Sequence, residues 1–145
     1  MNDLEKAIML LNDGSYTCAA CRGDEKYTST MRGVKPLLDL IDAQQTLDGY
    51  SVADRVVGRA AAFLYVELKA QRVHALIMSR AAQEVFIRYG IEYSYGALVD
   101  AIFNRTNTGL CPMESAVCDI QTPHEAELAV RARLRELMQP SMEAL

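Results

Sequence analysis

The stretch Val73–Met78, with the sequence VHALIM, is a nearly continuous apolar run in the middle of the chain, and it decides the fold class. A run of this length with one polar member is typical of a central strand covered on both faces of a sheet. A helical pattern follows over residues 79–89 and ends at Gly90, and residues 91–95 again favour a strand. A strand, a helix and a strand in this order predict a parallel pair joined by a crossover helix. We therefore expect an α/β fold.

The segment before this unit extends the pattern. Residues 4–11 have the spacing of a short helix that ends at Gly14, and residues 15–21 and 26–30 predict a hairpin around a polar turn. A further helix is expected through residues 37–41. Ser51 followed three residues later by Asp54 is typical of a capping arrangement, which predicts a helix from Ser51 to about Leu68. Its small residues at 58–62 let another backbone come close, so we expect this helix to be buried against a sheet.

The segment after it predicts two more helices before the end of the chain. Residues 97–103 are expected to form a short helix, and Thr122, Pro123 and Glu125 predict the start of a long one that runs to about Met138. No repeat or linker divides the chain. We therefore expect a single domain over residues 1–145, with its core at about 4–138, in which helices cover both faces of a mixed sheet in three α/β/α layers.

The composition excludes several classes of function. The chain has 145 residues, 50% of them hydrophobic, and a formal net charge of −4. This charge argues against nucleic acid or an anionic membrane as the main partner, because such binding depends on clustered Lys and Arg. The acidic start of the chain and the short apolar runs predict a cytoplasmic protein with reduced thiols and no membrane span.

Two of the four cysteines form a C-x-x-C pair, Cys18 and Cys21. Because both lie in a predicted strand, residues three apart point to opposite faces and cannot share a metal or bridge easily. We expect buried strand cysteines without a redox or zinc role. His74 lies in an apolar strand and is expected in the core, and His124 lies in the first turn of a helix.

Cys111 occupies a more informative position, directly before Pro112 and three residues before Glu114. Pro in the first turn and Glu at the third helical position would make Cys111 the cap of a short helix. A thiol there faces the positive end of the helix dipole, which favours a thiolate. Two interpretations remain open. Either Cys111 and Glu114 are candidate catalytic residues, or Cys111 is a modest cap and Glu114 satisfies the turn.

The candidate ligand-binding residues come from the loop before this cap and from the helix predicted at Ser51. Amides, hydroxyls and a guanidinium in the loop suit a phosphate or a base edge. In the predicted helix, Arg55 and Arg59 are four residues apart on one face, with Asp54 beside them. The residues expected to contact a ligand are Asp54, Arg59, Asn104, Arg105 and Thr106.

Several strings in the chain resemble a bacterial and archaeal domain-of-unknown-function family with a cytidine-deaminase-like fold. They are Gly33–Leu38, Ala53–Ala62, Asn104–Thr106 and Gly109–Glu114, and the resemblance covers about Leu4 to Leu128. The resemblance implies a cytidine-deaminase-like arrangement of the three layers and supplies no reaction.

The resemblance also allows a test for zinc chemistry. Zinc deaminases carry H-x-E on one helix and P-C-x-x-C on the next. At these places the chain has Gly58-Arg59-Ala60 and Ser79–Ala82, and neither histidine is followed two residues later by Glu. We therefore expect no zinc, no cofactor and no zinc-dependent deaminase activity.

Three hypotheses follow. The first is a metal-free protein of deaminase fold that binds a small anionic or nucleotide-like ligand at helix N-termini. The second is a thiol-dependent enzyme that uses Cys111. The third is an interaction module that forms a homodimer or a larger homo-oligomer.

Overall fold

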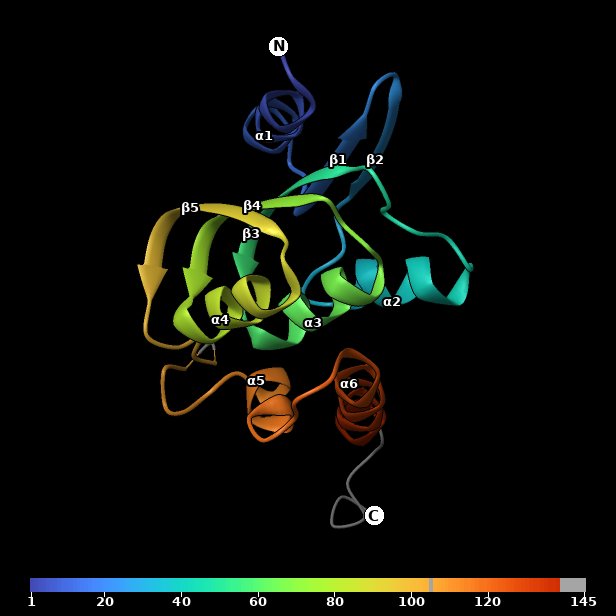
Figure 1. Ribbon diagram of the computed structural model, residues 1–145. Coiled ribbons are helices and arrows are strands. Elements are labelled where there is room, and N and C mark those ends of the chain that lie inside the picture. The colour runs from blue at the N-terminus through green and yellow to red at the C-terminus, as the bar shows by residue number, and fades with distance from the viewer. Residues whose placement is uncertain (105, 139–145) are drawn as a thin grey trace.

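Five strands form one mixed sheet in the computed structural model, which describes residues 1–104 and 106–138 (Figure 1). The strands are β1 (Cys18–Arg22), β2 (Glu25–Ser29), β3 (Ser51–Val57), β4 (Arg72–Ser79) and β5 (Glu92–Val99). Their order across the sheet is β2-β1-β3-β4-β5. β1 is antiparallel to both of its neighbours, whereas β3, β4 and β5 are parallel. The parallel β4–β5 pair and the β1–β2 hairpin confirm the predictions made from the sequence.

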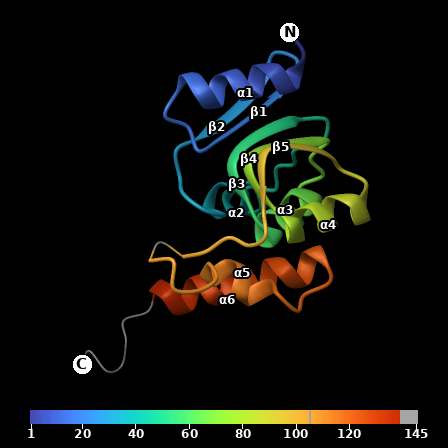
Figure 2. The ribbon, with the colours of Figure 1, turned by 90° about the vertical axis from the view of Figure 1, so that its left-hand side faces the viewer.

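Helices cover both faces of the sheet, so the α/β class is confirmed. Helix α1 (Asp3–Asp13) lies on one face, and α2 (Lys35–Asp42), α3 (Arg59–Glu67) and α4 (Arg80–Tyr89) lie on the other (Figure 2). Two further helices, α5 (Pro112–Val117) and α6 (Pro123–Met138), pack on the side of α3 that faces away from the sheet. Helix α3 is therefore enclosed between the sheet and the C-terminal helices.

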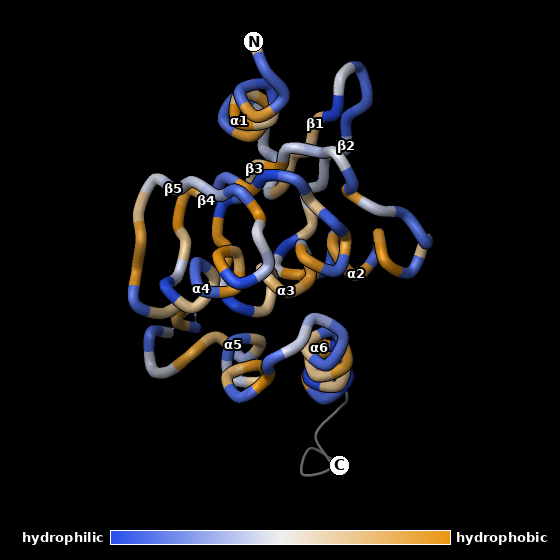
Figure 3. The backbone as a smooth tube through the Cα atoms, viewed as in Figure 1, coloured by the Kyte–Doolittle hydropathy of each residue, from blue (hydrophilic) through white to orange (hydrophobic). Residues whose placement is uncertain are grey.

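The main core lies between the sheet and α3. Six consecutive residues of α3, Ala60 to Tyr65, are buried, as expected for a helix covered on all sides. Hydrophobic segments run along β4 and over α2 and α3, whereas the tip of the β1–β2 hairpin is hydrophilic (Figure 3). A smaller core on the opposite face joins Ala7 and Leu11 of α1 to Cys21 and Ala53. Because Cys18 belongs to the main core and Cys21 to the smaller one, the two thiols lie on opposite faces of β1, as predicted.

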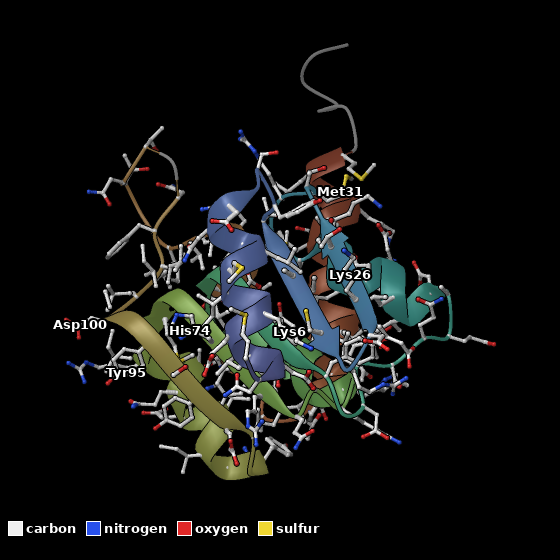
Figure 4. All side chains as sticks on the ribbon, turned by 90° about the horizontal axis from the view of Figure 1, so that it is seen from above. Lys6, Lys26, Met31, His74, Tyr95 and Asp100 are labelled. Carbon is white, nitrogen blue, oxygen red and sulfur yellow. The ribbon has the colours of Figure 1, made fainter. Side chains whose placement is uncertain are left out.

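Helix α1 covers only part of its face of the sheet. Seen from above, it lies over β1 and β3, and the part of β4 and β5 that carries His74 and Tyr95 lies beside it (Figure 4). His74 is half-buried, and its ring nitrogen Nδ1 lies 2.7 Å from the hydroxyl of Ser94 on β5. Burial lowers the pKa of His74. The prediction that β4 is covered on both faces therefore holds for the α3 side and only in part for the α1 side.

The prediction that a helix starts at Ser51 is wrong, whereas its predicted end near Leu68 is confirmed. Residues 51–57 form β3 between β1 and β4, and α3 starts only at Arg59, with Gly58 as its N-cap. Val52, Val56 and Val57 favour a strand, and pairing on both sides of β3 outweighs the local capping pattern. Arg55 and Arg59 therefore do not share a helix face, because Arg55 lies in the strand.

The prediction of a short helix over residues 97–103 is also wrong. β5 continues through Ala97 to Val99 in register with β4, and Phe103 makes an isolated bridge with Leu110. By contrast, α4 ends at Gly90 as predicted, with Gly90 in the left-handed region at φ 73°, and the structure shows that the Ser79 side chain caps its start. Within residues 1–104 and 106–138, no helix has the length and apolarity that crossing a bilayer requires.

Candidate functional site

A pocket of about 300 Å³ lies where β3 ends and α3 begins. The start of β1, the segment before α2 and the start of α5 close it on the other sides. Ligand sites in open α/β folds commonly lie outside the carboxyl ends of parallel strands, which is the position of this pocket. Much of its wall is apolar, with Val34, Leu37, Ala61, Ile102 and Met113 among the lining residues.

A chain of three polar side chains forms the inner wall. The hydroxyl of Tyr65 on α3 donates to Oδ2 of Asp54 on β3 at 2.6 Å. Sγ of Cys18 on β1 lies 3.5 Å from the Tyr65 hydroxyl oxygen. Because the Tyr65 proton is directed to Asp54, the Cys18 thiol is the donor in the second contact. Asp54 is thus held by a hydrogen bond from the helix that covers its strand.

Burial dominates the ionisation of these groups. It raises the pKa of Asp54 to about 6, although hydrogen bonds from Tyr65 and from the backbone N–H groups of Arg55 and Val56 favour the charged form. Burial, together with the charge of Asp54, raises the pKa values of Cys18 and Tyr65 far above their usual ranges. Near neutral pH, the pocket therefore contains a half-buried carboxylate beside a neutral phenol and a neutral thiol.

Glu114 caps α3 rather than its own helix. Its Oε1 accepts a hydrogen bond from the backbone N–H of Arg59 at 2.6 Å, and its Oε2 accepts one from that of Ala60 at 2.9 Å. The carboxylate satisfies two of the first N–H groups of α3 and complements the positive end of the helix dipole. Gly58 makes room for it, because a Cβ at position 58 would stand 2.3 Å from Oε1. The predicted role of Glu114 in the first turn of α5 is therefore corrected.

Two of the three arginines at or next to the pocket, Arg59 and Arg55, are engaged with backbone carbonyls. Arg59 donates through Nε to the carbonyl of Val117 at 3.1 Å and through Nη2 to that of Ile120, so its side chain joins α3 to the end of α5. Arg55 lines the pocket, but it donates to the carbonyls of Tyr16 and Leu11 at 2.8 and 3.2 Å. Arg32, at the exposed rim, also lines the pocket.

The Cys111 side chain is half-buried in the pocket wall and stands at the N-cap of α5, where it makes no capping hydrogen bond. Its backbone N–H donates to the carbonyl of Ile102 at 2.9 Å, which fixes the start of α5 against the chain that leaves β5. The structure therefore brings three of the sequence-predicted residues, Asp54, Cys111 and Glu114, to one pocket.

The polar loop contributes less than its sequence indicates. The side chain of Asn104 accepts from Thr106 at 3.2 Å and donates to Thr108 at 3.1 Å, so these polar groups satisfy one another within the loop. Neither Asn104 nor Thr106 is among the residues that line the pocket. Arg105, the third predicted residue of this loop, lies outside the described residues.

The structure adds lining residues that the sequence did not single out. Tyr65 lies in the predicted helix and carries no local motif, whereas the C-x-x-C pair that contains Cys18 predicts a buried core cysteine and no place in a pocket. Their position in the pocket follows from the pairing of β1 with β3, which sets Cys18 opposite Asp54. The sequence could have indicated Tyr65 only if residues 51–57 had been predicted as a strand that precedes the helix.

Comparisons with known proteins agree on one family. The model of the family described as "Domain of unknown function (DUF1893)" matches residues 6–134. The crystal structure of a DUF1893 family protein (TM1506) from Thermotoga maritima is similar with a TM-score of 0.80 and 26% identity, over 92% of this chain and 88% of that one. A search of curated proteins returned no match. A matched span of this length, together with the similar structure, shows that the chain belongs to the DUF1893 family.

Proposed function

We propose that this protein binds a small nucleotide-like or other anionic ligand in the pocket at the start of α3, within a cytidine-deaminase-like fold that lacks the zinc site. The observation that carries the proposal is a pocket of about 300 Å³ with an apolar wall, a half-buried carboxylate at Asp54 and the exposed Arg32 among its lining residues. Small-molecule sites have this character, with a mostly apolar lining and a few well-placed polar groups.

The two charged groups suit different parts of one ligand. Asp54 is held in place by Tyr65 at 2.6 Å, and its carboxylate suits the N–H groups of a heterocycle that lies among the apolar side chains. Arg32 suits a phosphate or carboxylate at the opening of the pocket. The α3 N-terminus itself already holds the Glu114 carboxylate, so we place the anion at Arg32 rather than at the helix start.

The proposed fold type rests on topology and on the sequence resemblance. The parallel unit β3-α3-β4-α4-β5 beside an antiparallel hairpin agrees with the arrangement that the resemblance implies. At the positions of the deaminase zinc ligands, the starts of α3 and α4 carry Arg59 and residues 79–82, which include neither His nor Cys. Deamination by a zinc-bound water is therefore not part of the proposal.

A thermal-shift titration tests the proposal. Nucleoside monophosphates and sugar phosphates, each added at rising concentration, should give a saturable increase in Tm for at least one compound, because a ligand at about 100 times its Kd stabilises the folded state by roughly 2.7 kcal/mol. Arg32→Ala and Asp54→Asn should weaken that increase, and Arg80→Ala, whose side chain pairs with Asp100 at the surface, should not. A flat response across the panel would contradict the proposal.

A second candidate function, thiol chemistry at Cys111, is favoured by the place of this side chain in the same pocket wall. Cys18 also lines the pocket, but burial keeps its thiol protonated. If Cys111 is a nucleophile, iodoacetamide should label it well below pH 8 and faster than Cys118, which is exposed at the other end of α5. Equal rates at the two cysteines would leave the binding protein as the better description.

A further inference from the structure

Three potential metal ligands converge at the far end of α3 from the pocket. Glu67 is the last residue of α3, and His124 and Glu127 lie three residues apart in the first turns of α6. One donor atom of each lies within 4.8 Å of the others. Nδ1 of His124 is 3.5 Å from Oε1 of Glu67 and 3.9 Å from Oε1 of Glu127. The cluster thus joins two helices that are distant in sequence.

An unsatisfied oxygen points independently to a ligand at this place. Oε2 of Glu67 is shielded from solvent and has no hydrogen-bond partner among the described residues. A buried carboxylate oxygen without a partner costs free energy, and a second carboxylate beside it increases that cost. Either a bridging proton or a cation would remove it.

The charges around the cluster leave it negative. Arg131 donates through Nε to Oε2 of Glu127 at 2.7 Å, and its Nη2 binds Asp42 at 2.8 Å. One guanidinium therefore serves two carboxylates, and among the described residues Glu67 has no basic partner other than His124. Since Arg131 holds only Oε2 of Glu127, Oε1 is left facing His124 and Glu67.

From these observations we propose that Glu67, His124 and Glu127 bind a divalent transition-metal ion, for which Zn²⁺ has the best-matched chemistry. Two ligands of a tetrahedral Zn²⁺ ion at its usual bond lengths are separated by about 3.4 Å, so the separations of 3.5 and 3.9 Å between His124 and the two carboxylates need only a small adjustment. An imidazole and two carboxylates suit Zn²⁺, whereas Mg²⁺ prefers oxygen ligands alone. Arg131 becomes the outer partner that orients Glu127.

The site is reachable and separate from the pocket. The His124 side chain is 72% exposed, which gives an ion a path from solvent and leaves a coordination position for water. Glu67 is seven residues from Ala60, or about 10 Å along the helix axis. The proposed metal site can therefore be tested independently of the proposed ligand. From the sequence we expect no zinc in this chain, and the proposed site departs from that expectation, although it uses none of the deaminase positions.

Isothermal titration of the EDTA-treated full chain with ZnCl₂, together with native mass spectrometry, tests the proposal. We expect one Zn²⁺ ion per chain with saturable binding, and a Kd that rises at least about tenfold in His124→Ala and in Glu67→Gln. The matched control is Glu125→Gln, a neighbouring exposed carboxylate in the same turn, which should bind as the wild type does. MgCl₂ at equal concentration should give no saturable heat.

Two outcomes would overturn the site. One is the absence of saturable Zn²⁺ binding, which would leave the cluster as an ion-pair network with a shared proton. The other is an unchanged Kd in both His124→Ala and Glu67→Gln, which would move the ion to a thiol such as Cys118. Because His124 is mostly exposed, its alanine variant should keep the wild-type circular dichroism spectrum, so loss of binding there cannot be ascribed to unfolding.

Discussion

Replacing Glu114 by Ala should destabilise the protein through α3, although the substitution lies in α5. Ala is a good helix former, so α5 itself loses little by the change. What is lost is the carboxylate that accepts hydrogen bonds from the backbone N–H groups of Arg59 and Ala60, at 2.6 and 2.9 Å. The first turn of α3 would then have two N–H groups without a protein partner.

The expected magnitude follows from these two contacts. A hydrogen bond to a charged group contributes about 1.5–3 kcal/mol net, and a carboxylate at a helix N-terminus adds roughly 0.3–1 kcal/mol. Water from the pocket can reach the position that the carboxylate leaves, because Glu114 lines that pocket. We therefore expect a loss at the lower end, about 3 kcal/mol for Glu114→Ala. Glu114→Gln keeps one accepting oxygen, whose neutral hydrogen bond contributes about 1 kcal/mol, and should therefore lose about 2 kcal/mol.

Urea denaturation followed by circular dichroism measures this loss. For a chain of this size, about 3 kcal/mol corresponds to a decrease in Tm of roughly 10 °C. The matched control is Glu84→Gln, an exposed carboxylate on α4, which should change the free energy of unfolding by no more than about 0.5 kcal/mol. If Glu114→Ala behaves like this control, the capping role of Glu114 is refuted.

Three further predictions concern the same pocket. Gly58→Ala should lower the free energy of unfolding about as much as Glu114→Ala does, because its Cβ would stand 2.3 Å from Oε1 of Glu114. The double variant should be no less stable than Glu114→Ala alone, and additive losses in the urea curves would contradict this. Tyr65→Phe should cost about 1–3 kcal/mol in the same assay, since it removes the hydrogen bond to Asp54, and a neutral result would show that water replaces the hydroxyl. Burial raises the pKa of Asp54 from 3.8 to about 6, so the folded state is more stable when Asp54 is protonated. This contribution is complete below pH 3.8 and is lost as the pH rises through 6, and it amounts to about 3 kcal/mol relative to Asp54→Asn, which cannot titrate. Parallel curves of stability against pH for the two proteins would refute it.

Local sequence patterns predicted the elements whose signals are local. The apolar run at 73–78, the helical pattern over 79–89 and Gly90 each act within a few residues, and β4 and α4 have the expected bounds to within one residue. Ser51 and Asp54 show the opposite case. Their spacing is that of a helix cap, but β3 is paired on both sides, and those sheet hydrogen bonds come from β1 and β4. Tertiary pairing outweighs a weak local preference of this kind.

The candidate site was predictable only in part, for the same reason. Asp54, Cys111 and Glu114 were singled out for their residue types and now share a pocket wall. The partner of Glu114 is 55 residues away, and the partner of Asp54 is a tyrosine without a motif around it. The charge of Arg59 predicts a ligand contact, but in the structure its side chain donates to backbone carbonyls at and just after the end of α5. Which donor meets which acceptor depends on how α5 docks, and no pattern within either segment encodes that.

Helix α3 connects these results, because each of its ends is completed by a different C-terminal helix. At its start, Glu114 of α5 supplies the cap that Gly58 cannot supply. At its end, Glu67 meets His124 and Glu127 of α6. A helix of nine residues is marginal by itself, so these contacts help to hold it against the sheet. Removing residues 111–138 would therefore open the pocket and the proposed metal site together and expose the outer face of α3, whereas a substitution at one end should leave binding at the other intact.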